Sequence, residues 1–259
     1  MQEKAVLKEL IHLSHELGKE ERGLVILGEG NTSADCGDGT FWVKASGSQL
    51  GTSDESSFSR VNMSYILDLM KADYLSDEQI EKELVNALVD KTHRKPSVET
   101  FFHAFCLHEA GVKWVGHVHP ISVNSILCSV QGAKPFLDSL FPDGIVVCGT
   151  KPAVLPYTDP GYTLSKAFRD EIRRYIQENG HAPKIVLMEN HGLVVLGQTS
   201  REALNIALMA DKWAKIIIGS YALGGTRPLS EKEVHRIDNR LDEHYRRREL
   251  TPGNVSTNQ

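Results

Sequence analysis

A tight turn followed by a β-prone segment places an antiparallel hairpin near the start of this chain. The turn is Asp35-Cys36-Gly37-Asp38-Gly39, and the segment after it is Thr40-Phe41-Trp42-Val43-Lys44. Glycine and aspartate suit short hairpin turns, whereas β-branched and aromatic residues fit a pleated strand. Segments of helical period lie on both sides, so strands and helices are mixed rather than strictly alternating. This order disfavours a doubly wound parallel sheet. It predicts an α/β fold, a three-layer αβα sandwich with a central mixed, largely antiparallel sheet.

Periodicity and capping residues predict the other elements. Helices are expected over 4–18, 77–90, 98–110, 121–129, 162–179, 200–222 and from 231 to about 248. Their N-caps are expected at Ser76, Ser97, Ser200 and Ser230. Further strands are expected over 24–27, 113–118, 145–148, 153–155, 184–188 and 192–197. No composition break divides the 259 residues, so 1–225 are expected to form one domain and 226–259 a helical extension and tail.

Composition excludes several classes of protein. A net charge of −5 with 24% charged residues gives no reason to expect nucleic acid or an anionic membrane as the partner. No apolar run approaches the roughly 18 residues of a membrane span, and the N-terminus lacks a signal-peptide core. A cytoplasmic location is therefore expected. The cysteines show no Cys-x-x-Cys spacing, and Cys106 and Cys128, among apolar neighbours, are expected in the core.

Three histidines form the candidate metal site. His117-Val118-His119 follows a short apolar segment, and residues two apart on a strand point to the same face, roughly 6 to 7 Å apart at their origins. Pro120 ends this strand, and His191 follows a second apolar run over 184–188. Most histidines ligate nothing, so the His-x-His pair alone is a weak signal. Three imidazoles with an open fourth position, however, describe a catalytic zinc site.

Three further segments carry groups suited to catalysis or anion binding. Gly28-Glu29-Gly30-Asn31-Thr32-Ser33 lacks the third glycine of a dinucleotide fingerprint and is interpreted as a bend whose backbone N–H groups suit an anion. Ala45-Ser46-Gly47-Ser48 follows a strand and has the composition of a second phosphate-binding wall. In Lys95-Pro96-Ser97-Val98-Glu99, the serine is placed to cap a helix, and the glutamate falls in its first turn. Each segment also fits an ordinary turn or cap. A carboxylate facing a metal would instead be a general acid or base.

Taken in order, these motifs resemble the class II aldolase/adducin-head family. The resemblance rests on Gly30-Asn31-Thr32-Ser33, Ser46-Gly47, Glu99 with His103, His117-Val118-His119-Pro120 and Asn190-His191-Gly192. It covers about residues 4 to 222 in the order and spacing of the family. Fuculose-phosphate and rhamnulose-phosphate aldolases and ribulose-phosphate 4-epimerases belong to this family. The resemblance implies an αβα catalytic domain over 1–225, a catalytic divalent metal, usually Zn²⁺ with Mn²⁺ or Fe²⁺ as alternatives, and a homotetramer with active sites between subunits.

Carried over by position, the resemblance also implies roles for individual residues. The metal ligands would be His117, His119 and His191. Glu99 would be the catalytic acid or base. The phosphate pocket would be lined by Gly30, Asn31, Ser46, Gly47 and Ser97. The implied activity is that of a metal-dependent lyase, an aldolase that cleaves a phosphorylated ketose or sugar derivative through a metal-bound enediolate. The expected partner is a phosphorylated small molecule, without nucleic acid or membrane.

Two departures from the family pattern keep other reactions open. Val98 stands where fuculose-type aldolases have a second serine, and no tyrosine around 136–141 matches their proton donor; Tyr157 and Tyr162 are near only in sequence. Decarboxylation of an oxo sugar-acid phosphate and dehydration of methylthioribulose phosphate are therefore alternatives within the same fold. A non-catalytic adducin-like module and a mononuclear zinc hydrolase are alternatives from other classes. The presence of all three histidines weighs against the module.

Overall fold

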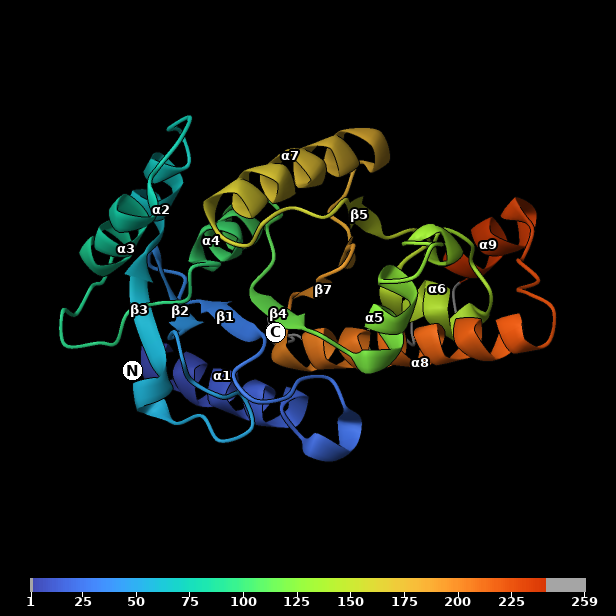
Figure 1. Ribbon diagram of the computed structural model, residues 1–259, viewed down its shortest axis with the longest axis horizontal. Helices are drawn as coiled ribbons and strands as arrows, with labels where there is room; N and C mark the ends of the chain where they lie inside the picture. Colours follow the sequence, from blue (N-terminus) through green and yellow to red (C-terminus); the bar gives the residue numbers. More distant parts are fainter. Residues whose placement is uncertain (1, 241–259) are drawn as a thin grey trace, which may run out of the picture.

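A twisted sheet with helices on both faces forms the centre of the molecule (Figure 1). The computed structural model describes residues 2–240. Its strands are β1 (Asn31–Asp35), β2 (Thr40–Lys44), β3 (Phe58–Asn62), β4 (Trp114–Val118), β5 (Ala153–Leu155), β6 (Ile185–Met188) and β7 (Gly192–Gly197). They form one seven-stranded sheet in the order β3-β2-β1-β4-β7-β6-β5. Among the strands described, only β5 and β6 pair in parallel, which confirms the mixed, largely antiparallel sheet.

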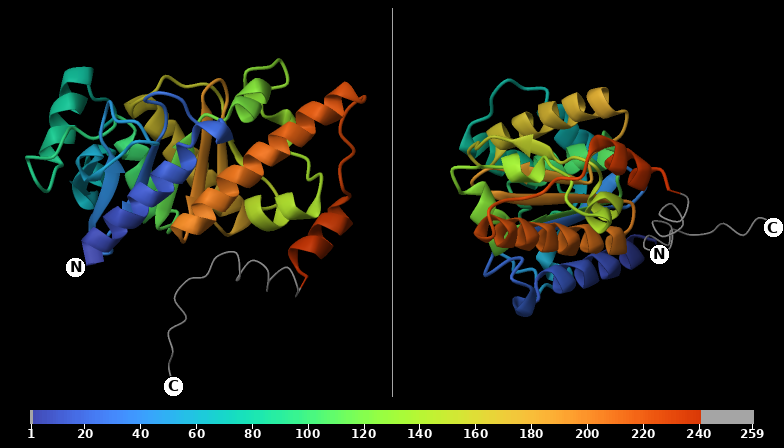
Figure 2. Two further views of the ribbon diagram at one scale, coloured as in Figure 1. Left: turned by 90° about the horizontal axis from the view of Figure 1, so that it is seen from below. Right: turned by 90° about the vertical axis from the view of Figure 1, so that its right-hand side faces the viewer.

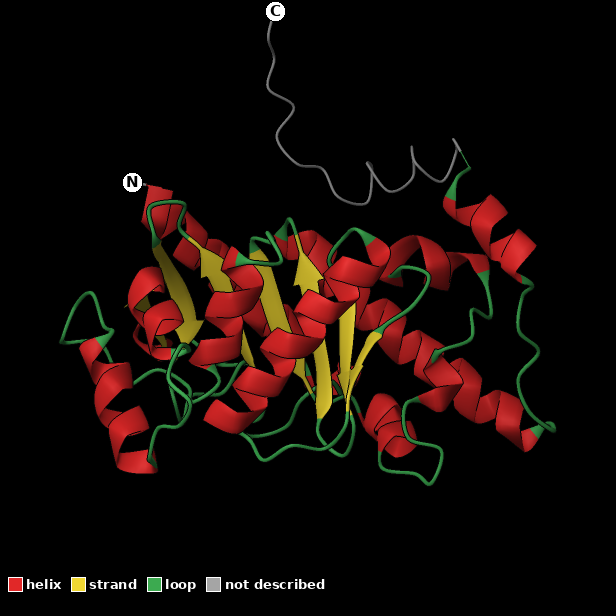
Figure 3. Ribbon diagram, turned by 90° about the horizontal axis from the view of Figure 1, so that it is seen from above, coloured by secondary structure: helices red, strands yellow, loops and turns green. Residues whose placement is uncertain are grey.

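Helices cover both faces of this sheet, so the molecule has three layers (Figures 1 and 2). One face carries α1 (Gln2–Leu17), α5 (Ile121–Leu127) and α8 (Ser200–Ala222). The other carries α2 (Met63–Leu69), α3 (Asp77–Asn86), α4 (Thr100–His108) and α7 (Tyr162–Asn179). Figure 3 shows the strands lying side by side beneath the helices of this second face. The remaining helical segments are α6 (Pro142–Cys148), α9 (Glu231–Asp238) and the 3-10 turns η1 (Glu20–Arg22), η2 (Glu55–Ser57) and η3 (Lys134–Phe136).

Strand alternation decides which face carries the candidate site. In β4, Trp114 and Val118 pack in the cluster with α1 and α8, whereas Val115 packs in the cluster with α4 and α7. His117 lies two residues after Val115 and therefore shares the α4 face. β1 and β4 are antiparallel neighbours, and their register places Asn31 opposite His117. The sheet thus brings these two side chains together beneath α4.

Most of the expected elements are present. The hairpin at Asp35–Gly39 is confirmed, because β1 and β2 pair with Asp35 opposite Phe41. The strands expected over 113–118, 153–155, 184–188 and 192–197 are confirmed with small shifts at their ends. The long helices are confirmed as well, and α7 ends as expected at Gly180, which has a φ of +75°. β3 and α2 are additions that the sequence patterns did not predict.

The prediction of a strand over 145–148 is wrong, because these residues belong to α6. Pro142 stands at the first position of this helix, where a missing N–H is tolerated. Ile145 and Val146 are buried against Ile237 of α9. Packing between helices therefore overrides the β-propensity of the Ile-Val-Val run. The boundary expected at residue 225 stays a prediction.

The prediction of a strand over 24–27 is also wrong. Leu24 and Val25 are buried, but Ile26 and Leu27 are 59% and 76% exposed. Leu27 has a φ of +51°, a left-handed conformation that no regular strand contains. The chain turns here, and β1 begins only at Asn31, within the segment interpreted as a bend.

Smaller corrections concern caps and cysteines. Glu99 rather than Ser97 occupies the N-cap of α4, and Thr199 rather than Ser200 caps α8. Ser76 and Ser230 are N-caps as expected. Cys106 is buried as expected, but Cys128 is exposed. The part of the last predicted helix beyond residue 240, and the tail, lie outside the described residues. Within residues 2–240, no helix combines the length and apolarity needed to cross a bilayer.

Candidate metal centre and active site

Three histidines from two neighbouring strands converge at one end of the sheet. His117 lies in β4 and His119 just beyond it, while His191 directly precedes β7, the strand paired with β4. One potential ligand atom of each lies within 4.8 Å of the others, and the Nε2 atoms of His117 and His119 are 3.0 Å apart. Two nitrogen ligands of one tetrahedral zinc ion lie about 3.3 Å apart, given a Zn–N bond near 2.0 Å. The trio can therefore bind a single metal ion.

The protonation state of the histidines suits metal binding. Burial, together with the neighbouring imidazoles, lowers the pKa of His117 to about 3 and that of His119 to about 4. Burial also lowers the pKa of His191. The rings are thus neutral near pH 7, which is the form that binds metals. Nδ1 of His117 lies 3.1 Å from the carbonyl oxygen of Leu193 and donates to it, so Nε2 keeps its lone pair.

The surroundings of His191 also fit a metal ion. Its Nδ1 is buried and has no hydrogen-bond partner among the residues described. A Cβ on the next residue, Gly192, would lie 2.6 Å from Cδ2 of His119 and 2.9 Å from the carbonyl oxygen of Val118. Only glycine lets β7 approach the histidine rings this closely. The glycine after the third histidine is therefore part of the packing that gathers the trio.

The carboxylate of Glu99 faces these histidines. Its Oε2 lies 3.5 Å from Nε2 of His117, and its Oε1 lies 3.5 Å from Nε2 of His191. Glu99 is 7% exposed and stands at the N-cap of α4, where the helix dipole favours a negative charge. The Nδ2 of Asn31 donates to Oε2 at 2.6 Å. A carboxylate fixed in this way can accept or donate a proton beside a bound cation.

The residues predicted to bind phosphate come together beside Glu99. The N–H of Ser46 donates to the carbonyl of Lys95 at 2.9 Å, and that of Ser97 donates to the carbonyl of Lys44 at 3.1 Å. These bonds hold the loop after β2 against the segment that leads into α4. The Nδ2 of Asn31 lies 3.3 Å from Oγ of Ser97, which joins β1 to the same corner.

Both glycines of this corner have left-handed backbones. Gly30 has a φ of +66°, and a Cβ there would lie 2.4 Å from the carbonyl oxygen of His117. Gly47 has a φ of +74°, and the nearest atom to its Cβ would be Nη2 of Arg94 at 3.7 Å. Gly30 is therefore required by its contact with β4, and Gly47 by its conformation alone.

Two cations that the sequence patterns did not single out lie at the loop after β2. Lys44 is 3% exposed, and its Nζ donates to the carbonyl of Ser48 at 2.5 Å. Burial lowers the pKa of Lys44 to about 8, although the charge of Glu99 opposes this shift. Arg94 donates from Nη1 to Oγ of Ser48 and from Nη2 to the carbonyl of Ser46. In the sequence, the feature that could have identified Lys44 is its position as the last residue of a strand that is otherwise largely apolar.

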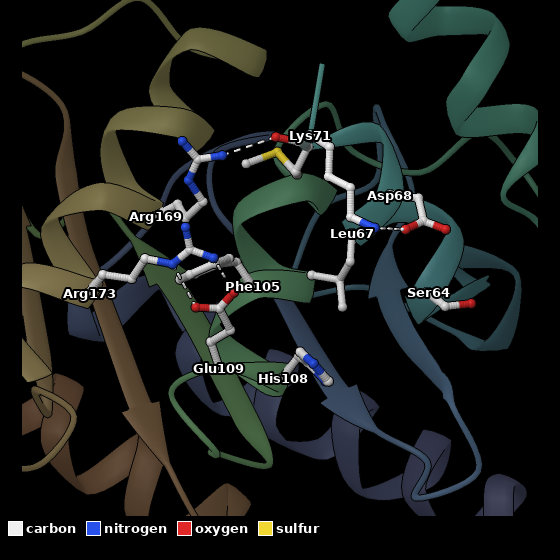
Figure 4. Close-up of a pocket in the computed structure, with 10 residues that line it drawn as sticks. Ser64, Leu67, Asp68, Lys71, Phe105, His108, Glu109, Arg169 and Arg173 are labelled. Carbon is white, nitrogen blue, oxygen red and sulfur yellow. Dashed lines mark hydrogen bonds and ion pairs between the residues drawn. The ribbon is translucent and has the colours of Figure 1, made fainter. Parts of the chain in front are cut away.

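Two pockets in the described part of the chain differ in their chemistry. A pocket of about 300 Å³ opens beside His119 and leaves room for a substrate; it is lined also by Gly23, Val25, Ile26, Glu29, Ile121, Asn124 and Ser125. A second pocket, of about 400 Å³, lies between α2, α4 and α7, at the end of α4 remote from Glu99 (Figure 4). Its charged side chains largely have partners, because Arg173 donates two hydrogen bonds to the carboxylate of Glu109 and Arg169 donates to the carbonyl of Met70. The first pocket is therefore the better candidate for chemistry.

The tyrosines near in sequence are engaged elsewhere. The hydroxyl of Tyr162 lies 2.8 Å from the carbonyl of Leu69 and 2.7 Å from that of Ala72, which gives this side chain a structural role. Tyr157 is 57% exposed and donates to Asp159 at 2.9 Å. Within residues 2–240, neither hydroxyl is hydrogen-bonded to a residue of the candidate site.

Comparison with known proteins gives concordant results. The model of the class II aldolase and adducin N-terminal domain matches residues 8–218. The uncharacterized oxidoreductase YuxG of Bacillus subtilis (strain 168) is 33% identical in an alignment 246 residues long, which covers 89% of this chain but only 33% of that relative's length. The N-terminal class II aldolase domain of a conserved protein from Thermoplasma acidophilum is 28% identical with a TM-score of 0.66, and 82% of this chain covers 93% of it. An L-fuculose 1-phosphate aldolase shares the fold with a TM-score of 0.69 at 20% identity, and 90% of this chain covers 94% of it.

Proposed function

Because the chain belongs to the class II aldolase and adducin N-terminal domain family, we propose that it is a metal-dependent lyase acting on a phosphorylated ketose or sugar derivative. The reaction would be cleavage of a carbon–carbon bond. The observation that carries the proposal is the position of Glu99, whose carboxylate oxygens lie 3.5 Å from ring nitrogens of both His117 and His191. An acid or base directly beside a cation site is the arrangement that such a cleavage requires.

In this proposal the metal ligands are His117, His119 and His191. Neutral imidazoles suit Zn²⁺, and also Mn²⁺ or Fe²⁺, so the choice of Zn²⁺ rests on its usual role in this family. When bound, the ion supplies a positive charge that stabilises the negative charge developing on a substrate oxygen as the bond breaks. The protein's part is to hold the three rings neutral and close together.

Glu99 moves the proton in this proposal. Its carboxylate would take a proton from, or return one to, the substrate carbon next to the carbonyl group. Asn31 orients the carboxylate through the 2.6 Å hydrogen bond to Oε2. Burial of Glu99 excludes bulk water from this proton transfer.

The phosphate would lie at the corner formed by Gly30, Asn31, Ser46, Gly47 and Ser97. The loop at Ser46-Gly47 and the serine hydroxyl offer N–H and O–H donors, as phosphate recognition requires. Lys44 and Arg94, bonded to Ser48 of the same loop, add positive charge. An anion is therefore favoured at this corner and disfavoured beside Glu29, whose carboxylate lines the pocket at His119.

Decarboxylation is the second candidate reaction. It is favoured by the engagement of Tyr162 with two backbone carbonyls, which removes one candidate for the tyrosine proton donor of an aldol cleavage. A decarboxylase of an oxo sugar-acid phosphate needs the same cation and the same corner but no such donor. A dehydratase of the same fold is a third reaction. A non-catalytic module is disfavoured by the intact histidine trio.

An oxidoreductase activity, as named for the Bacillus relative, is not part of the proposal. Residues 28–33 lack the third glycine of a dinucleotide fingerprint, and they lead into β1 rather than into a helix. The chain also spans only 33% of that relative's length. The homotetramer and the cytoplasmic location remain predictions; light scattering would test the first and cell fractionation the second.

A substrate screen tests the proposed function. The purified chain, loaded with Zn²⁺, Mn²⁺ or Fe²⁺, would be incubated with phosphorylated ketoses and with oxo sugar-acid phosphates. Release of an aldehyde with dihydroxyacetone phosphate supports the aldolase, and release of CO₂ supports the decarboxylase. Glu99→Gln, loaded in the same way, is the matched control. A stoichiometrically loaded protein that turns over neither class would refute the proposal.

A further inference from the structure

The ring of His103, a residue of α4, is completely buried against β1, yet both of its nitrogens have polar partners. Nδ1 lies 2.6 Å from Oγ of Ser33, and Nε2 is hydrogen-bonded to Oδ1 of Asn31. Ser33 and Asn31 are alternate residues of β1 and therefore point to the same face of the sheet. The ring of Phe102 stacks on His103 with 4.6 Å between centroids. A buried polar ring held on three sides has little freedom to reorient.

The direction of each hydrogen bond in this cluster follows from its neighbours. A carboxylate only accepts, so the group of Asn31 that faces Glu99 at 2.6 Å is its Nδ2 amide. The Oδ1 of Asn31 consequently faces His103, and since an amide oxygen only accepts, Nε2 of His103 carries a proton. Burial lowers the pKa of His103 to about 3, so the ring is neutral and its Nδ1 is unprotonated. Nδ1 therefore accepts from the hydroxyl of Ser33.

The result is a one-way relay in which Ser33 donates to His103, His103 to Asn31, and Asn31 to Glu99. The two ends of an asparagine amide have nearly the same shape, so packing alone does not decide which end faces the carboxylate. In the flipped orientation, Oδ1 of Asn31 would lie against the carboxylate oxygens of Glu99 and repel them. With its proton on Nε2, the ring of His103 also opposes that orientation, because the amide group of Asn31 would then face an N–H with its own N–H donors.

We propose that His103 is a positioning residue that fixes the amide of Asn31 and, through it, the carboxylate of Glu99. The inference rests on the proposed role of Glu99 as acid or base. His103 itself touches neither the substrate nor the cation. It acts by keeping a donor, rather than an acceptor, directed at Glu99.

The ring tautomer gives a test that does not depend on activity. The full chain, labelled with ¹⁵N at histidine, would be studied near pH 7 by correlation of ring nitrogens with ring C–H protons, and the His103 signals would be identified by their loss in His103→Gln. The expected result is a neutral ring with its proton on Nε2. A proton on Nδ1, or on both nitrogens, would overturn the proposal.

Two substitutions of the same residue give the kinetic test. Glutamine can present an N–H near the position of Nε2, whereas leucine has no donor. His103→Leu is expected to lower kcat by about 10- to 100-fold, the usual effect of removing a partner one step from a metal site, with KM and bound metal unchanged. His103→Gln is expected to recover most of this loss. Tyr175→Phe, which removes a partly buried hydrogen bond to the carbonyl of Lys151, is the matched control and should leave kcat unchanged.

The outcomes separate this proposal from the proposed function. A wild-type kcat in His103→Leu, or equal losses in His103→Gln and His103→Leu, would overturn the relay. Should His103→Leu fail to fold, the ring tautomer of the wild-type chain decides the relay: a proton on Nε2 supports it, and a proton on Nδ1 overturns it. If the wild-type chain cleaves no substrate, the proposed function fails, and the ring tautomer still decides the relay.

Discussion

The Nε2 atoms of His117 and His119 lie 3.0 Å apart, at the spacing of two ligands of one metal ion. Because Nδ1 of His117 donates to the carbonyl of Leu193, Nε2 of His117 carries a lone pair. Without a metal, a proton on Nε2 of His119 can form a hydrogen bond to this lone pair. With a metal bound, both rings direct lone pairs at the same cation. The arrangement thus requires only that the proton of the neutral His119 ring move from Nε2 to Nδ1 before the ion binds.

Removal of the third imidazole should therefore weaken metal binding severely. We expect the affinity of His191→Ala for Zn²⁺ to be lower by at least about 100-fold. Loss of a group that only hydrogen-bonds to a metal ligand costs up to about this factor, and loss of a ligand itself should cost more. Isothermal titration with Zn²⁺ and metal analysis of the purified protein measure this. His181→Ala, at an exposed histidine, is the control. Unchanged Zn²⁺ affinity in His191→Ala would remove this residue from the ligand set.

Glu99→Gln should separate metal binding from turnover. The amide keeps the size of the side chain but cannot accept a proton, so we expect kcat to fall by about 10²- to 10⁴-fold while Zn²⁺ binding is retained. The quantities to measure are kcat on whichever substrate the screen identifies and the metal content of both proteins. Full activity in the variant would show that another group moves the proton.

The contact between Gly30 and β4 should be visible in stability. A Cβ at Gly30 meets the carbonyl of His117 at 2.4 Å, whereas Gly37 has a similar φ of +77° and no atom within 4 Å of its Cβ. We expect Gly37→Ala to cost about 1 kcal/mol for the left-handed backbone alone, and Gly30→Ala to cost about 3 kcal/mol or more. Urea unfolding of both variants gives the difference. Equal losses of unfolding free energy in the two variants would mean that β1 and β4 move apart to accommodate the added methyl group.

The buried neutral ring of His103 should make the metal-free protein sensitive to acid. The folded-state pKa of His103, about 3, is depressed below the ordinary value of 6.5. The unfolded chain therefore binds more protons between these values, and the stability contributed above pH 6.5 is lost as the pH falls. Between pH 7 and pH 5 we expect the wild type to lose about 2 kcal/mol more than His103→Gln. Parallel declines of the two proteins in urea unfolding would contradict a neutral His103.

Much of the fold could be predicted because local signals agreed with it. The Gly-Asp turn before Thr40–Lys44, and the glycine that ends α7, fix local geometry whatever surrounds them. The prediction of a strand over 145–148 failed because the Ile-Val-Val sequence suits a strand and a buried helix equally well. The helix is stabilised by packing against Ile237, which lies nearly a hundred positions further along the chain. A pattern read over a short stretch of sequence cannot include such a partner.

The sequence predicted some residues of the candidate site and their arrangement, but not the contacts of others. The spacing of His117 and His119 on one strand already implied a shared face, and the structure brings Glu99 and His191 to the same place. The link between His103 and Asn31 could not be predicted, because it depends on the packing of α4 over β1. Hydrogen bonds between elements distant in sequence leave no periodic trace in a single chain.

The central pairing of β1 with β4, and of β4 with β7, has a consequence for biosynthesis. It joins Asn31 to His117 and His117 to Val194, partners that are separated by long segments of chain with helices and strands of their own. A nascent chain still attached to the ribosome cannot gather all three imidazoles until β7 has been translated. Closing such distant pairs is slow, so the cation would bind at the end of folding and stabilise only those copies whose sheet is complete.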